Sequence, residues 1–93
     1  MKYKFTAKDF WKIVEEKQNF KCALTGRLLE PNNTEIELKR PLAKGGKVSI
    51  DNHYAVDMAI SKLARYFTEE EIINLAAEVI QYRGKEYGFK LEK

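Results

Sequence analysis

The apolar positions near the start of the chain recur at helical spacing. Phe10, Ile13 and Val14 share one face of a helix, because residues three and four apart lie one above the other. Thr6 precedes this run and Asp9 stands three residues after Thr6, which is the arrangement of a capping box at a helix start. The pattern predicts a helix over residues 7–17.

A second helical repeat occupies the last third of the chain. Thr68 is followed directly by a run of glutamates, and the positive end of a helix dipole favours carboxylates in the first turn. Capping and dipole chemistry therefore explain these acids better than a metal site does. Apolar residues then repeat at 3–4 spacing up to Gly84, namely Ile72, Leu75, Ala76, Val79 and Ile80. We predict a long, core-facing amphipathic helix.

The pattern changes between these two predicted helices. Residues 35–38 (EIEL) alternate as in a short strand, and Pro41 cannot continue a strand ladder because it lacks an N–H. A loop containing residues 44–47 (KGGK) follows, and a second strand at 53–56 leads into a helix at 57–65. The local order is strand, loop, strand, helix, which with the flanking helices predicts an α+β fold.

Length and composition fit a single domain over residues 1–93. Of the 93 residues, 44% are apolar and 33% are charged, which excludes a disordered chain. The domain divides into an N-terminal helix (1–19), a hairpin with a central unit (20–66), and a C-terminal helix with a tail (67–93). A core of this size is marginal, so a dimer or a bound partner would add stability. The oligomeric state stays open.

Charge interrupts every apolar stretch, so we expect no membrane segment, no secretory segment and a cytoplasmic location. The net charge of +3 does not by itself indicate nucleic-acid binding. Residues 1–19 carry five lysines and three acids, residues 20–66 eight basic residues and five acids, and residues 67–93 four basic residues and six acids. The basic excess lies in the first two-thirds, where it is either a solvated surface or a binding surface.

Three segments in the middle of the chain resemble the HNH endonuclease family. They are residues 20–29 (FKCALTGRLL), 36–46 (IELKRPLAKGG) and 49–52 (SIDN), and the similarity covers about residues 20–72 without gaps. The resemblance implies a ββα-metal unit, in which two strands and a helix surround a divalent ion. The expected fold is thus a small HNH-like domain with an additional helix at each end.

The sequence departs from this family at the positions where the family binds metal and activates water. Glu37 stands where the family has a metal-binding acid, but Leu38 stands where it has the histidine that activates water. Asn52 matches the asparagine that braces the loop. Ser61 replaces the helix asparagine that completes the metal site, and Ala64 replaces a basic residue. The resemblance therefore implies a degenerate member of the family.

These replacements predict an inactive site. Leucine cannot accept a proton, and losing a positioned general base typically lowers the rate by ~10²–10⁴. Mg²⁺ requires near-octahedral oxygen ligands, and a serine hydroxyl is a poorer ligand than an amide oxygen. Glu37 alone is a weak candidate for metal binding, so we expect no metal and no cofactor. We accordingly expect a protein that is not an enzyme.

Three further residues have a chemical and a structural interpretation. His53 could replace the missing histidine, but successive strand residues point to opposite faces, so it should face away from Asn52. Cys22 has no accompanying catalytic arrangement and is expected to be a buried structural thiol. Trp11 lies on a different face from part of the Phe10 stripe and could serve an interface.

The expected function is binding of DNA, or of a nucleic-acid-processing complex, without catalysis. The candidate contacts are the basic residues that the resemblance places near the phosphate backbone: Lys39, Arg40, Lys44, Lys47, Lys62 and Arg65. One alternative is a small phage or mobile-element inhibitor that binds a protein effector of a host defence such as CRISPR. The other is a residual metal-dependent DNA endonuclease.

Overall fold

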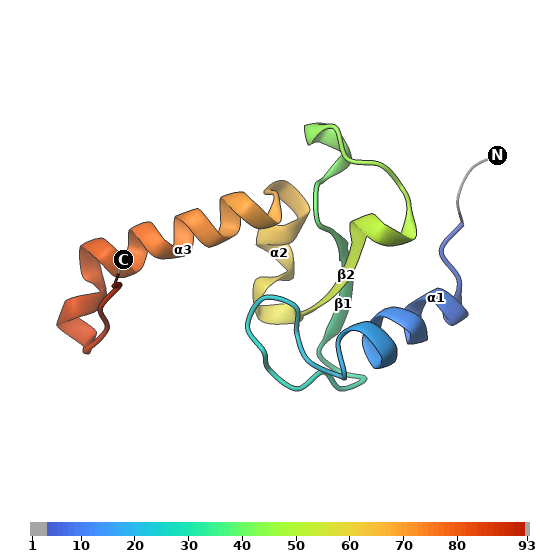
Figure 1. Cartoon of the computed structure of the whole chain (residues 1–93), viewed down its shortest axis with the longest axis horizontal. Helices are drawn as coiled ribbons and strands as arrows, with labels where there is room; N and C mark the ends of the chain where they lie inside the picture. Colours follow the sequence, from blue (N-terminus) through green and yellow to red (C-terminus); the bar gives the residue numbers. More distant parts are fainter. Residues whose placement is uncertain (1–3, 93) are drawn as a thin grey trace.

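The fold is a small α+β domain, and the computed structural model describes residues 4–92 (Figure 1). Its α-helices are α1 (Ala7–Trp11), α2 (Met58–Tyr66) and α3 (Glu69–Arg83), and its strands are β1 (Thr34–Leu38) and β2 (His53–Asp57). A π-helix, η1 (Lys12–Lys17), continues α1, and the short 3-10 helices are η2 (Leu42–Lys44), η3 (Ile50–Asn52) and η4 (Gly84–Tyr87). The predicted order of strand, loop, strand and helix is confirmed.

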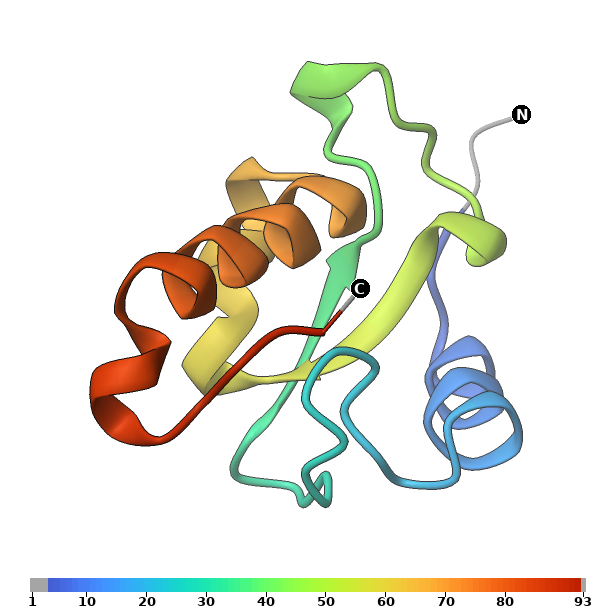
Figure 2. The same ribbon diagram turned by 60° about the vertical axis from the view of Figure 1, so that its left-hand side comes forward.

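Strands β1 and β2 form an antiparallel hairpin between two helical layers. The register runs from Thr34 opposite Asp57 to Leu38 opposite His53. α2 and the start of α3 lie on one side of the hairpin, and α1 with η1 lies on the other (Figure 2). Both faces of the hairpin are therefore covered, which explains why most of β2 is buried.

The N-terminal helix has the predicted bounds but not a uniform type. Thr6 and Asp9 form both bonds of the capping box, as predicted. From Lys12 onward the turns widen, and the Gln18 N–H donates to the carbonyl of Ile13, five residues back, at 3.0 Å. The 3–4 apolar spacing does not distinguish an α-helix from a π-helix, because both place neighbouring apolar residues on one side.

Gln18, at the end of η1, occupies the outer edge of β2. Its side-chain Nε2 donates to the carbonyl of Ala55 at 2.8 Å, and the Ala55 N–H donates to its Oε1 at 2.9 Å. The Ala23 N–H donates to the same carbonyl at 3.1 Å. The side-chain amide thus makes both hydrogen bonds that a backbone peptide would make there, and it fixes the N-terminal helix to the hairpin.

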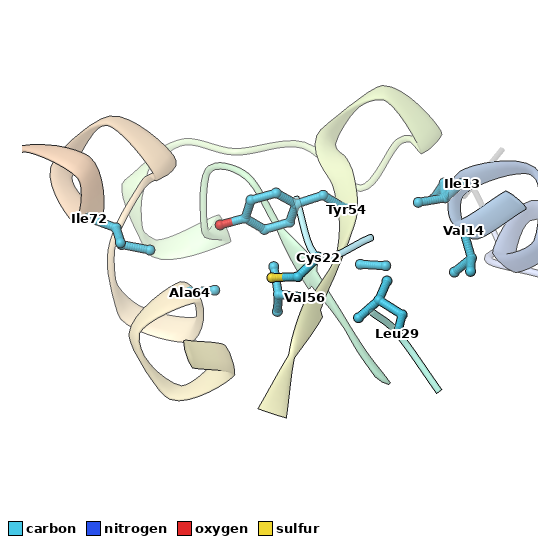
Figure 3. Close-up of a cluster of buried hydrophobic side chains, with 9 residues drawn as sticks. Ile13, Val14, Cys22, Leu29, Tyr54, Val56, Ala64 and Ile72 are labelled. Atoms are coloured by element: carbon cyan, nitrogen blue, oxygen red, sulfur yellow. The ribbon is translucent and has the colours of Figure 1, made fainter. Parts of the chain in front are cut away.

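The core lies where the hairpin meets both helical layers (Figure 3). Its buried members are Ile13, Val14, Cys22, Leu29, Tyr54, Ala55, Val56, Ala64 and Ile72. The buried position predicted for Cys22 is confirmed, and its Sγ accepts the Asp57 N–H at 3.2 Å and the Thr25 N–H at 3.4 Å. Trp11 lies outside the core, exposed, with its ring edge-to-face to Phe10.

The prediction of a core-facing C-terminal helix is wrong for most of its length. The capping box of Thr68 and Glu71 is present as predicted, and Ile72 is only 4% exposed. Leu75 and Val79, however, are 41% and 55% exposed, and α3 projects away from the hairpin (Figure 1). Periodicity identifies the apolar face of a helix but not what covers it. In this chain the core extends only along the first turns of α3.

The helices of the structure are too short or too polar to cross a membrane, as judged over residues 4–92.

Candidate functional site

Asn52 holds together the loop that connects β1 to β2, residues 39–52, which we call the basic loop. Its Nδ2 donates to the carbonyls of Arg40 at 3.0 Å and Lys47 at 2.7 Å, and its Oδ1 accepts the Arg40 N–H at 3.0 Å. The Lys39 N–H donates to the backbone carbonyl of Asn52 at 2.7 Å and continues the hairpin. One side-chain amide therefore fixes both sides of the loop.

Two glycines allow the turn of the basic loop, for different reasons. Gly45 has a φ of +85°, a left-handed conformation that a residue with a Cβ adopts at a cost of roughly 1 kcal/mol. At Gly46 the limit is space, because a Cβ there would overlap the carbonyl oxygen of Arg40. The Gly46 N–H also donates to the carbonyl of Pro41 at 3.0 Å. The backbone of the turn therefore packs directly against the chain that leaves β1.

Glu37, the candidate metal-binding acid, is held by a cation of the protein itself. Arg65 on α2 approaches it with Nε 3.2 Å from Oε2, and Arg65 Nη2 lies 3.9 Å from Oε1 of Glu35. Burial raises the pKa of Glu37, while the hydrogen bond and charge of Arg65 oppose that rise without cancelling it. The carboxylate is thus largely desolvated and paired with a guanidinium.

Leu38, at the candidate position of the general base, lines a hollow between β1, the start of the basic loop and α2. This hollow, of about 300 Å³, is lined by Glu37, Leu38, Pro41, Leu42, Ala43, Ala64 and Arg65. It brings together four residues singled out from the sequence, Glu37 and Leu38 on the strand and Ala64 and Arg65 on the helix. Among residues 4–92, the charged groups in its wall are the paired carboxylate and guanidinium.

Ser61 and His53 lie apart from this cavity lining. Ser61 is buried on α2, and its hydroxyl donates to the carbonyl of Met58 at 3.1 Å, which leaves it turned into its own helix. The ring of His53 lies 4.8 Å from that of Phe5, and its Nδ1 is hydrogen-bonded to the carbonyl of Ser49. His53 stands directly opposite Leu38 in the hairpin, so the two side chains share a face, but its ring is engaged by Phe5 and Ser49 and does not line the hollow that contains Glu37.

The six candidate basic residues differ in their partners. Lys44 Nζ lies 2.7 and 2.8 Å from the two carboxylate oxygens of Glu71, and 5.2 Å from the ring centre of Phe67. This hydrogen bond, followed by that from the Thr68 backbone, lowers the pKa of Glu71. Lys44 therefore ties the basic loop to the first turn of α3, and Arg65 is similarly engaged by Glu37.

The other four candidates make no ion pair in the described part of the chain. These residues, Lys39, Arg40, Lys47 and Lys62, are exposed. Arg40 and Lys47 line one hollow of the basic loop together with Asp51, and Lys39 and Arg40 line the next together with Glu69 and Glu70. Arg40 is also positioned by a bond from Nη1 to the carbonyl of Lys44 at 3.2 Å. Three adjacent cations are thus presented by a braced loop, with Lys62 on the separate helix α2.

Sequence reasoning missed Glu71 as a partner of the basic loop. Its position three residues after Thr68 explained it completely as part of a capping box, and it does fill that role. The contact with Lys44 joins residues 27 positions apart, so only a tertiary arrangement could reveal it. The pairing of Arg65 with Glu37 was missed for the same reason.

In the described part of the chain, no group of three or more histidine, cysteine or acidic side chains is arranged to hold a metal ion. No protein-family model, curated protein or solved structure was found to match the chain.

Proposed function

We propose that this protein is a catalytically inactive HNH-like module that binds the sugar–phosphate backbone of DNA through its basic loop. Two observations support this most directly. Asn52 holds a loop whose Lys39, Arg40 and Lys47 are exposed and make no ion pair over residues 4–92, and Arg65 neutralises the Glu37 carboxylate. According to this proposal, the protein keeps the DNA-binding surface of an HNH-like unit but has lost the hydrolytic activity.

The neighbours of Glu37 disfavour hydrolysis. A divalent ion would have to displace the guanidinium of Arg65 from a desolvated carboxylate. Leu38 beside it cannot accept a proton from water, and Ser61 donates its hydroxyl to a backbone carbonyl. Single-metal hydrolysis of a phosphodiester needs both a bound ion and an activated water. Neither requirement has a residue suited to it in this cavity.

We therefore expect no nicking of supercoiled plasmid DNA in the presence of Mg²⁺ or Mn²⁺. The measurement is an agarose gel assay of the purified protein, with Glu37→Gln prepared in parallel. Cleavage by the parent protein that disappears in Glu37→Gln would show that this carboxylate does hold a catalytic metal, and the proposal of an inactive site would be wrong. Cleavage that persists equally in both proteins indicates a contaminating nuclease.

The exposed cations of the basic loop favour DNA binding. Lysine and arginine contacts to phosphates release counterions, which supplies sequence-independent affinity. A loop braced by an internal amide loses little freedom on binding, so its cations are already positioned. Arg40 adds a planar fork of donors suited to phosphate oxygens. Recognition by these groups depends on the backbone and carries no sequence preference.

The test compares two variants that lose the same charge. In the loop variant Lys39, Arg40 and Lys47 are replaced by Gln, and in the control variant the exposed residues Lys8, Lys12 and Lys21 are replaced by Gln. Affinity for a random duplex is measured by fluorescence anisotropy over a range of salt concentrations. Three phosphate contacts predict a slope of log K against log salt of about −2.7 for the parent, and the loop variant should lose most of it. The control variant should keep the parental slope within about one unit.

Two results would overturn the proposal. The first is an absence of DNA affinity in the parent at low salt, and the second is an equal loss of affinity in both variants. Either result would favour the alternative function, in which the basic loop binds a protein effector and the protein inhibits a nucleic-acid-processing complex.

A further inference from the structure

A groove lies between the N-terminal helix and the segment that leads into β1, and we call it the aromatic groove. Its volume is about 460 Å³, within the range of sites that bind small molecules. It is lined by Phe10, Trp11, Val14, Phe20, Leu29, Glu30, Pro31 and Thr34. None of these residues belongs to the basic loop or lines the hollow at Leu38. The groove is therefore separate from the candidate site described above.

The aromatic rings of the groove are held by the backbone and by each other. Phe20 has a φ of +60°, a left-handed conformation that is strained for a bulky residue. Its N–H donates to the Val14 carbonyl at 2.8 Å, and its carbonyl accepts the Leu29 N–H at 2.7 Å. The rings of Phe10 and Trp11 pack edge-to-face, with centres 5.3 Å apart. Strained non-glycine residues cluster at ligand sites, where they fix a side chain for binding.

Glu30 gives the groove a negative charge. Over residues 4–92, its carboxylate is the charged group in the groove wall, and it makes no ion pair. The backbone of Glu30 is fixed on both sides, because its N–H donates to Asn33 Oδ1 and its carbonyl accepts the Thr34 hydroxyl, each at 2.6 Å. The faces of aromatic rings also carry negative partial charge. Rings and carboxylate together attract a cation.

The polar groups of the groove are too few for a cation that carries many N–H donors. The hydroxyl of Thr34, the other polar side chain in the wall, already donates to the Glu30 carbonyl. A guanidinium has five N–H donors and an ammonium has three, and burying such donors without partners is costly. A quaternary ammonium has no N–H donor, and its methyl groups pack against apolar surface. Ring faces and one carboxylate are therefore sufficient to bind it.

We propose that the aromatic groove binds a small-molecule quaternary ammonium compound. Its cationic head lies against the rings of Phe10, Trp11 and Phe20, and the Glu30 carboxylate balances its charge. The groove volume fits a small molecule. This site is independent of the proposed DNA binding, because the two surfaces share no residue.

The first experiment uses Trp11 as its own probe. Trp11 is the single tryptophan of the sequence, so its fluorescence reports directly on the groove. The parent protein is titrated at constant ionic strength with choline and, separately, with the neutral isostere of choline, in which a tert-butyl group replaces the trimethylammonium group. We expect choline to change the Trp11 emission saturably and to bind at least about tenfold more tightly than the neutral isostere.

The second experiment compares variants by isothermal titration calorimetry with choline. Glu30→Gln removes the charge of the groove, and Glu78→Gln removes the same charge from an exposed position on α3. Trp11→Leu removes one ring of the groove, and Tyr66→Leu removes an exposed ring on α2. We expect Glu30→Gln and Trp11→Leu each to weaken choline binding by about 5–10-fold, and the two controls to change it by less than about twofold. Circular dichroism checks that each variant keeps its helix content.

Four outcomes would overturn the proposal. An absence of saturable binding up to about 10 mM choline would show that the groove is not a site for this class of compound. Equal affinity for choline and its neutral isostere would show that the groove takes apolar groups regardless of charge. Equal weakening in Glu30→Gln and Glu78→Gln would leave only a long-range effect of net charge. A trimethyllysine peptide or phosphatidylcholine vesicles that bind more than about tenfold more tightly than choline would assign the groove to a protein or a membrane instead.

Discussion

Replacing Tyr54 by alanine should lower the free energy of unfolding by about 3–5 kcal/mol, the range for removing a large buried aromatic side chain. Tyr54 is 1% exposed, and its ring crosses the centre of the core with the hydroxyl toward Ala64 and Ile72 (Figure 3). A small domain has only about 5–15 kcal/mol of stability in total. The variant should therefore be close to unfolding, which a urea titration followed by circular dichroism would measure.

Tyr54→Phe is the matched control, and it should behave in the opposite way. Among the described residues, the Tyr54 hydroxyl is a buried polar group without a hydrogen-bond partner. Burial, followed by the charges of Glu69 and Glu37, raises the pKa of Tyr54 to about 12. Removing an unsatisfied buried hydroxyl relieves a desolvation cost of about 1–3 kcal/mol. Tyr54→Phe should thus be as stable as the parent or more stable. A clear loss of stability would indicate that the hydroxyl has a partner in solution.

Gly46→Ala should lower DNA affinity by at least about tenfold, or ~1.4 kcal/mol, without changing the charge of the protein. The added Cβ would overlap the Arg40 carbonyl oxygen, so the turn must open and the bond from Gly46 to Pro41 must break. Opening the turn moves Arg40 and Lys47 apart. The stability should fall by about 1–3 kcal/mol. DNA titration at constant salt and urea unfolding measure the two effects separately.

Gly26→Ala serves as the control for this prediction. Gly26 has a φ of +75° and no atom within 4 Å of an added Cβ, so alanine there introduces backbone strain without overlap. It lies outside the basic loop and should leave DNA affinity unchanged while costing about 1 kcal/mol of stability. Equal affinity losses in Gly26→Ala and Gly46→Ala would mean that general destabilisation, and not the shape of the loop, weakens binding.

The local features of the fold could be predicted because they depend on residues close together in the sequence. Thr6 and Thr68 each begin a helix through a capping box, whose bonds span only three residues. The alternation at residues 35–38 and the restriction imposed by Pro41 likewise act locally, and β1 ends at Leu38, before that proline. Such interactions can be identified from spacing alone.

The partners of charged side chains could not be predicted in this way. The resemblance groups Lys44 and Arg65 with the other four basic residues as one surface that approaches the phosphate backbone. In the fold, Glu71 and Glu37 each engage one of them across 27 and 28 positions of sequence. The exposure of Val79 could not be predicted either, because the apolar pattern of α3 continues beyond the point where the small core ends. Both features depend on which residues lie close together in the folded chain, and the periodicity of the sequence does not show this.

The amide of Gln18 also limits how the sheet can grow. A strand at the edge of a sheet offers unpaired N–H and carbonyl groups, on which another extended chain can add a strand and begin aggregation. At Ala55 both groups are already bonded to this side chain, and the Ala23 N–H shares the carbonyl. A strand from another chain would have to expel Gln18 and detach η1 before it could pair with β2. Although the sheet has only two strands, the outer edge of β2 at Ala55 is therefore not available for pairing with a strand of another chain.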